Sequence, residues 1–229
     1  MNGLFDAVGS DKGAGIGDRH RYGSFYEVIF APRKSRPTRL LELGVSRGAS
    51  IHVWFQYFDD VEIHGIDVDL GKCRLPDDIR SAVSLYEGDV CNPMLVQHVE
   101  GFDVIIDDAD HTQHTQNQCL SLYWPKLKAG GLYIIEDLFV GKLPWGGQSS
   151  PSPMRWIDRP YNGYSAAPDR KYLPKRPQDL AFLNRKGLPE HLFAILDQNN
   201  HFLAITNISR DGGLHILLVI QKDAVLNEA

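Results

Sequence analysis

Three carboxylates and two imidazoles lie within the eight residues 107–114, DDADHTQH, directly after the apolar run FDVII. Charged groups at the end of a buried strand are costly unless they are solvated, paired or bound to an ion. A second acidic pair, Glu136-Asp137, follows the apolar run GGLYII, at an interval that fits one helix and a strand returning to the same sheet edge. Neighbouring parallel strands lie roughly 5 Å apart, so these carboxylates should converge and repel one another without a cation. Because oxygen ligands suit Mg²⁺, we expect Asp108, Glu136 and Asp137 to hold that ion.

Other arrangements of these groups are open. The two aspartates that begin the stretch could cap the following helix, while Glu136 pairs with a basic neighbour. Zinc held by His111 and His114 is disfavoured, because no thiolate lies nearby and the remaining ligands are carboxylates. We expect His114 to face solvent and Asp110 to cap a helix.

Apolar runs of strand length alternate with helical segments along the first part of the chain. The expected strands are 39–44, 61–69, 82–89, 102–108 and 130–137, and the expected helices between them are 49–58, 92–99 and 112–127. This alternation predicts a parallel sheet with helices on both faces. Two later runs, HFLAITNIS and LHILLVIQK, flank the turn sequence Arg-Asp-Gly-Gly and predict an antiparallel hairpin. The fold class is therefore α/β, a doubly wound and mostly parallel seven-stranded sheet with a C-terminal antiparallel hairpin.

We expect a single domain over residues 1–229, with residues 1–37 as an N-terminal helical cap. Residues 138–177 are rich in Pro, Gly and Ser and also carry aromatic and arginine side chains. A connection this long is typical of a lid or a substrate loop, and a disordered insert is the alternative. A further helix is expected over about 178–186.

Composition excludes several classes of partner. The formal net charge is −5, from 24 Lys and Arg against 29 Asp and Glu, and no long basic run is present, which argues against nucleic acid as the main partner. The three cysteines form no Cys-x-x-Cys and indicate reduced thiols. No signal peptide or membrane-length apolar run is evident. We expect a soluble cytoplasmic protein with no membrane partner.

A glycine turn follows the first expected strand, as Glu42-x-Gly44-x-x-x-Gly48. Glycines permit a tight turn and a close approach of a ligand to a helix N-terminus. The Gly-x-Gly-x-x-Gly pattern of dinucleotide sites is absent. Ligands of parallel sheets bind outside the carboxyl ends of the strands. There, an acidic residue after the second strand could accept ribose hydroxyls, and an acidic and an apolar residue after the third could hold an adenine. The expected cofactor-binding residues are Glu42, Gly44, Ser46, Gly48, Asp67, Asp89, Val90 and Asp107.

Together, these strand ends resemble the class I S-adenosylmethionine-dependent methyltransferases over residues 38–137, with their Rossmann-like fold. Asp108-x-x-His111 followed by Glu136-Asp137 looks like the metal-dependent sugar O-methyltransferases of antibiotic biosynthesis, the mycinamicin and macrocin type. The segment GSDKG…RHRYGSFYEVIF at 9–30 looks like the part of that family that precedes the methyltransferase core. The resemblance implies S-adenosylmethionine and Mg²⁺ as cofactors, the two Asp and the Glu as metal ligands, and His111 as the general base. It also implies a homo-oligomer that methylates a hydroxyl, of a sugar in a natural product or a similar small molecule.

Rival functions on this fold have distinct tests. The acceptor could instead be a catechol or an amino group, since catechol-type methyltransferases place a metal similarly. A nucleotide-dependent oxidoreductase or epimerase would bind NAD rather than S-adenosylhomocysteine in calorimetry. A non-catalytic binding module is disfavoured by the full set of metal and base residues. The chain is also shorter than the macrolide enzymes that carry an extra N-terminal domain.

Overall fold

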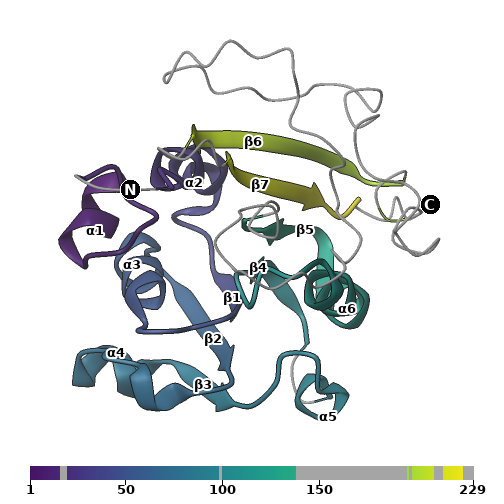
Figure 1. Cartoon of the computed structure of the whole chain (residues 1–229), viewed down its shortest axis with the longest axis horizontal. Helices are drawn as coiled ribbons and strands as arrows, with labels where there is room; N and C mark the ends of the chain where they lie inside the picture. The colour runs from purple at the N-terminus through teal and green to yellow at the C-terminus, as the bar shows by residue number, and fades with distance from the viewer. Residues whose placement is uncertain (16–19, 98–99, 138–194, 196–197, 209–213, 224–229) are drawn as a thin grey trace, which may run out of the picture.

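Seven strands form one sheet in the order β3-β2-β1-β4-β5-β7-β6 in a computed structural model of the chain (Figure 1). The structure describes residues 1–15, 20–97, 100–137, 195, 198–208 and 214–223. The strands are β1 (Thr38–Leu43), β2 (Val61–Asp67), β3 (Ser84–Glu87), β4 (Phe102–Asp107), β5 (Leu127–Ile135), β6 (Asn200–Ile208) and β7 (Leu214–Gln221). β1 to β5 pair in parallel, and β7 pairs antiparallel with both β5 and β6. The predicted fold class and C-terminal antiparallel strands are confirmed.

The described helices connect these strands and precede them. They are α1 (Asn2–Ala7), α2 (Gly23–Phe30), α3 (Ala49–Tyr57), α4 (Asp77–Ala82), α5 (Pro93–Val96) and α6 (Gln113–Tyr123), with short 3₁₀ turns at Ala31–Arg33, Leu70–Lys72 and Trp124–Lys126. Asn92 caps α5 by accepting a hydrogen bond from the Met94 backbone N–H at 3.0 Å, with Pro93 at the first helical position. None of the described helices is long and apolar enough to cross a membrane.

Alternating side chains on the strands separate two apolar clusters, one on each face of the sheet. On one face Leu40 and Val104 pack with the aromatic side chains of α1, α2 and α3. On the other face Leu41 and Ile105 pack with Cys119, Leu120 and Tyr123 of α6. Figure 1 shows α1 and α3 on one side of the strands and α6 on the other. Because successive strand side chains point to opposite faces, the central strands are apolar on both sides, as a covered parallel sheet requires.

Two parts of the prediction differ from the structure or lie outside its description. α4 was not expected, since its six residues are too few to show a helical period, although Asp77 and Asp78 stand in its first turn, where the helix dipole favours acidic side chains. The expected lid at 138–177, the expected helix at 178–186 and the Arg-Asp-Gly-Gly turn lie outside the described residues. The single-domain boundaries stay a prediction.

Candidate active site

Three parallel strands end level with one another at the carboxyl edge of the sheet. Asp107 of β4 is in register with Leu43 of β1 and with Ile135 of β5. The Asp108 N–H donates to the Leu43 carbonyl, and the Glu136 N–H donates to the Asp107 carbonyl, each at 2.9 Å. The residues that follow these strands are therefore adjacent, as the sequence predicted.

The glycine turn after β1 is fixed by close approach of backbone to backbone. Gly44 has φ of +89°, and a Cβ there would lie 2.2 Å from the Asp108 carbonyl oxygen. Gly48, with φ of +84°, is the N-cap of α3. Both positions lie in the left-handed region that glycine adopts without strain. The turn thus packs directly against the chain after β4, which brings the predicted cofactor loop to the acidic stretch.

Asp67, at the end of β2, is bonded to the glycine turn. Its Oδ2 accepts hydrogen bonds from the backbone N–H groups of Val45 at 2.8 Å and Ser46 at 2.7 Å, and its Oδ1 accepts from Asp69 N–H at 2.9 Å. A carboxylate has about four acceptor positions, so these three bonds leave capacity for a hydroxyl donor. The ribose role of Asp67 stays a prediction, and the carboxylate also holds the turn in place.

The edge beyond β3 combines polar and apolar groups. Asp89 is exposed and accepts a hydrogen bond from Cys91 N–H at 2.8 Å, while Val90 is buried. Val68, directly after Asp67, is 75% exposed, an unusual exposure for a large apolar side chain among the described residues. This exposed apolar side chain lies directly after the acidic end of β2.

Two buried carboxylate oxygens, Glu42 Oε1 and Asp107 Oδ1, have no hydrogen-bond partner among the described residues. The other Glu42 oxygen accepts from Trp54 Nε1 at 3.2 Å. Burial raises the pKa of Glu42 to about 7 and that of Asp107 to about 8. Buried polar atoms normally find partners, so these oxygens mark an edge suited to a polar ligand.

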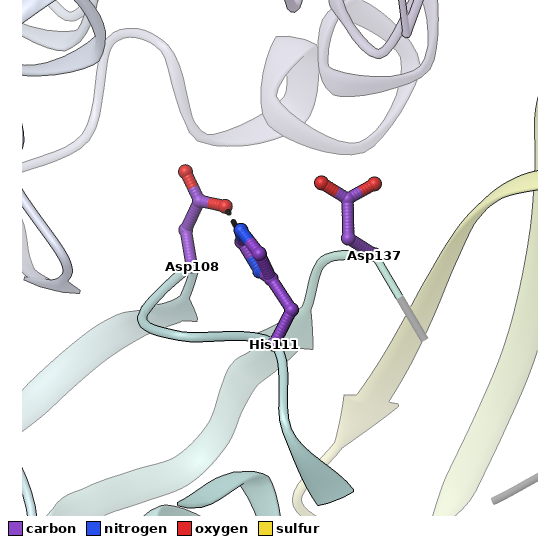
Figure 2. Close-up of side chains that lie close together, drawn as sticks. All are labelled: Asp108, His111 and Asp137. Atoms are coloured by element: carbon purple, nitrogen blue, oxygen red, sulfur yellow. Dashed lines mark ion pairs between the residues drawn. The ribbon is translucent and has the colours of Figure 1, made fainter. Parts of the chain in front are cut away.

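Asp108, His111 and Asp137 bring one ligand atom each within 4.8 Å of one another. Figure 2 shows the two carboxylates and the imidazole side by side, rising from the ends of β4 and β5. His111 Nδ1 lies 3.8 Å from Asp108 Oδ1, and in the described part of the chain this buried atom makes no hydrogen bond. Two carboxylates and a free imidazole nitrogen at this spacing fit a divalent cation.

The backbone at this cluster is held in an uncommon conformation. His111 and Asp137 have φ values of +59° and +51°, and Ser46, in the adjacent glycine turn, has φ of +49°. Positive φ in a residue other than glycine persists only when the surrounding structure fixes it, and it concentrates at functional sites.

Glu136 is fully buried but faces other partners. Its Oε2 accepts from Lys12 Nζ and its Oε1 from the Tyr26 hydroxyl, each at 2.5 Å. Pairing of Glu136 with a basic neighbour is the alternative considered from the sequence, and Lys12 is that neighbour. Metal ligation by Glu136 stays a prediction.

The N-terminal segment supplies site residues that the sequence reasoning missed. Lys12 Nζ also donates to Asp108 Oδ2 at 2.5 Å, and the Tyr22 hydroxyl donates to Asp137 Oδ1 at 2.5 Å. His20 Nδ1 lies 3.5 Å from Asp137 Oδ2. Burial alone lowers the pKa of Lys12, but the adjacent carboxylates raise it well above its ordinary value, so this lysine is a cation. The signal was present in GSDKG and RHRYGSFYE, whose polar residues have no evident role in a helical cap.

The remaining polar residues of the stretch lie at the start of α6. His114 is exposed. Asp110 accepts from Thr112 N–H at 2.9 Å and from the Thr115 hydroxyl at 2.8 Å, at the start of α6. The solvent-facing position of His114 is confirmed, whereas the N-cap of α6 is Thr112 and not Asp110, which accepts hydrogen bonds from the capping residues.

Sequence comparisons connect this geometry to a family. Residues 41–138 match the family described as "Methyltransferase domain". The chain is 32% identical over 152 residues to 8-demethyl-8-alpha-L-rhamnosyl tetracenomycin-C 2'-O-methyltransferase of Streptomyces olivaceus, covering 63% of this chain and 39% of that protein. It is 27% identical over 148 residues to mycinamicin VI 2''-O-methyltransferase of Micromonospora griseorubida, covering 59% and 36%. The chain thus spans less than half the length of these curated relatives.

Solved structures share the fold. MycE methyltransferase, in complex with Mg, S-adenosylhomocysteine (SAH) and mycinamycin VI, superposes with a TM-score of 0.60 at 18% identity over 100% of this chain and 56% of that one. An O-methyltransferase from Bacillus cereus in complex with SAH gives a TM-score of 0.55 at 11% identity, covering 96% and 89%. At these identities the likeness shows the fold. Residues 41–138 therefore match the methyltransferase domain family in sequence, and the sheet that contains them has the fold of these solved structures.

Proposed function

We propose that this protein transfers the methyl group of S-adenosylmethionine to a hydroxyl of a small molecule. The acceptor hydroxyl belongs to a sugar of a glycosylated natural product, and the reaction requires Mg²⁺ at the site. The observation that carries the proposal is the convergence of Asp108, His111 and Asp137 beside the glycine turn of a methyltransferase domain. The named activities of the curated relatives, two of them methylations of sugars in antibiotics, support the choice of acceptor.

The cofactor would lie along the carboxyl edge from β1 to β3. We assign its methionine end to Gly44, Ser46 and Gly48, its ribose to Asp67, and its adenine to Asp89 and Val90. The unpaired oxygens of Glu42 and Asp107 support a polar ligand at the same edge. Asp67→Ala should weaken SAH binding by about 1–3 kcal/mol, the usual cost of losing a hydrogen bond to a charged side chain.

The acidic end of the site would hold the cation through Asp108 and Asp137, with Glu136 as the third predicted ligand. When bound, the cation supplies Lewis acidity at the acceptor hydroxyl, and S-adenosylmethionine supplies a methyl group already activated on sulfur. The side chains of the chain position these two groups and exclude water from the buried edge, and positioning of this kind can account for much of a rate enhancement.

His111 would remove the acceptor proton. A neutral imidazole has one nitrogen that can accept a proton, which suits a general base. The acceptor hydroxyl would lose its proton to a ring nitrogen of His111, and its oxygen would take the methyl group that S-adenosylmethionine supplies, with SAH as the leaving group. The absence of a hydrogen bond on Nδ1 among the described residues supports an imidazole that is free to act as base or as ligand.

Calorimetry and methyl transfer test the proposal together. The full chain should bind SAH and not NAD, and it should transfer label from S-adenosylmethionine to a rhamnosylated polyketide in the presence of Mg²⁺. Excess EDTA should abolish turnover while SAH binding largely survives. Binding of NAD instead of SAH would contradict the proposed cofactor, and full turnover in EDTA would contradict the metal requirement. Label transfer to a catechol but not to the rhamnosylated polyketide would show that the acceptor is a catechol.

We propose in addition that the protein is a cytoplasmic homo-oligomer. Sedimentation velocity should give a mass at least twice that of the 25.8 kDa chain. A monomer over the micromolar range would contradict the oligomer.

A further inference from the structure

The amino group of Lys12 lies inside the carboxylate cluster. Its Nζ contacts Asp108 Oδ2 and Glu136 Oε2 at 2.5 Å each, and the side chain is only 5% exposed. A buried ammonium is costly unless it is paired, and here it has two carboxylate partners. The contact joins residues distant in sequence, from the N-terminal segment to the ends of β4 and β5.

The backbone N–H and carbonyl of Lys12 both form hydrogen bonds, which fix the position of this residue. The Lys12 N–H donates to the Ser10 hydroxyl at 3.2 Å, and its carbonyl accepts from Gly23 N–H, at the start of α2, at 2.9 Å. Tyr26 of α2 then donates to the second oxygen of Glu136. Lys12 and Tyr26, both from the N-terminal part of the chain, therefore bind the two carboxylate oxygens of Glu136.

Several carboxyl groups are concentrated at this edge of the sheet. Glu42, Glu136 and Asp137 are nearly or fully buried, and Asp108 is one-fifth exposed. Carboxylates this close repel each other when no cation lies between them. Lys12 places an ammonium against Asp108 Oδ2 and Glu136 Oε2, whereas His111 lies nearest to Asp108 Oδ1.

We propose that Lys12 is an internal counter-ion that keeps the carboxylates assembled when no metal ion is bound and that lowers the affinity of the site for a divalent cation. This inference rests on the proposed metal site. Lys12 is a positioning residue in this role, acting through Asp108 and Glu136. Its ammonium and the divalent cation are attracted by the same carboxylates and repel each other, so removing one should favour binding of the other.

The decisive measurement is Mn²⁺ affinity, with Mn²⁺ as a probe that electron paramagnetic resonance detects directly. In Lys12→Met the dissociation constant should fall at least about tenfold relative to wild type, since a full charge near the cation is removed. Lys12→Arg keeps the charge and should stay near the wild-type constant. Lys128→Met is the matched control, because Lys128 pairs with Asp103 near the opposite end of the same strands and its loss changes net charge equally.

Thermal unfolding gives a second readout on the same variants. In EDTA, Lys12→Met should unfold at a lower temperature than wild type, and saturating Mn²⁺ should raise its Tm by more than it raises the wild-type Tm. If Lys12→Met does not fold in EDTA, folding upon addition of Mn²⁺ supports the inference. The double variant Lys12→Met/Glu136→Gln removes the pair together and should fold in EDTA with a higher Tm than Lys12→Met.

The outcomes separate this inference from the proposed function. If wild type binds Mn²⁺ and Lys12→Met binds it equally or more weakly, Lys12 is only a scaffold and the inference is overturned, while metal-dependent transfer stands. If only Lys12→Met binds Mn²⁺, the internal counter-ion is supported and metal dependence of the wild-type protein is contradicted. If neither binds, or if neither Lys12→Met nor the double variant folds with Mn²⁺, the inference fails.

Discussion

Single residues set the shape of this site through backbone contacts as much as through side chains. Gly44 is the clearest case, because the turn after β1 and the chain after β4 approach so closely that no Cβ fits between them. The contact couples the proposed cofactor loop to Asp108. A change at Gly44 should therefore disturb both halves of the site.

Gly44→Ala should destabilise the protein by at least about 2 kcal/mol, because it combines a positive φ, costing roughly 1–2 kcal/mol, with a clash against backbone. Urea unfolding followed by circular dichroism measures this. Gly9→Ala is the matched control, since Gly9 has φ of +73° but nothing within 4 Å of the added Cβ. If Gly44→Ala lowers the free energy of unfolding no more than Gly9→Ala does, the chain after β4 can move away from the added Cβ without cost.

His111→Ala should lower kcat by roughly 10²–10⁴-fold if the imidazole is the base, while Mn²⁺ and SAH affinities stay near wild type. A variant that loses Mn²⁺ and regains turnover at high metal concentration would make His111 a ligand. His114→Ala, which changes an exposed imidazole on the same loop and helix, is the control and should leave both properties unchanged.

At the scale of elements, the N-terminal helices are attached to the sheet by aromatic packing. Phe5 of α1 contacts Trp54 of α3 edge-on, with ring centroids 5.3 Å apart, and Tyr26 of α2 lies 4.8 Å from the same indole. Lys12 and Tyr22, which contact the carboxylates, lie in the segment between α1 and α2, and Tyr26 lies on α2. Packing on one face of the sheet thus positions charge at its edge.

Phe5→Ala should cost about 3–5 kcal/mol, the usual range for removing a fully buried aromatic side chain. Because α1 and α2 share the core with α3, the loss should appear in one cooperative transition, measured by both tryptophan fluorescence and circular dichroism. Val28 on α2 is 55% exposed, so Val28→Ala should change the free energy of unfolding by less than about 0.5 kcal/mol. Two separate transitions in Phe5→Ala would mean that the cap unfolds independently.

The sequence predicted the elements whose physical signal is local. Alternating apolar strands and the acidic residues that end them were recognisable, because parallel strands bring their carboxyl ends to one edge whatever the details. The contact of Lys12 with Glu136 spans 124 residues of sequence, and no periodicity encodes such a distance. The rotation of Glu136 toward Lys12 and Tyr26, rather than toward His111, depends on packing of α2. That packing becomes visible only once the fold exists.

At the scale of the whole molecule, buried carboxyl groups make stability depend on pH. Burial raises the pKa of Glu42 to about 7 from an ordinary value of 4.5. Between these values the folded chain holds a proton on Glu42 that the unfolded chain has released. Stability from this group is therefore present at low pH and is lost as pH rises from about 4.5 to 7. Asp107, whose pKa burial raises to about 8, acts in the same direction over an overlapping window.

Glu42→Gln should remove the Glu42 part of this dependence and leave the rest. In EDTA and without cofactor, the wild-type free energy of unfolding should fall between pH 5 and 7 more steeply than that of Glu42→Gln, by up to about 3 kcal/mol over the window. Urea unfolding at a series of pH values measures the two slopes. Glu62→Gln removes the same formal charge from a side chain that is 60% exposed and should keep the wild-type slope. Equal slopes in wild type and Glu42→Gln would mean that Glu42 is ionised in the fold, its charge balanced by the ammonium of Lys12.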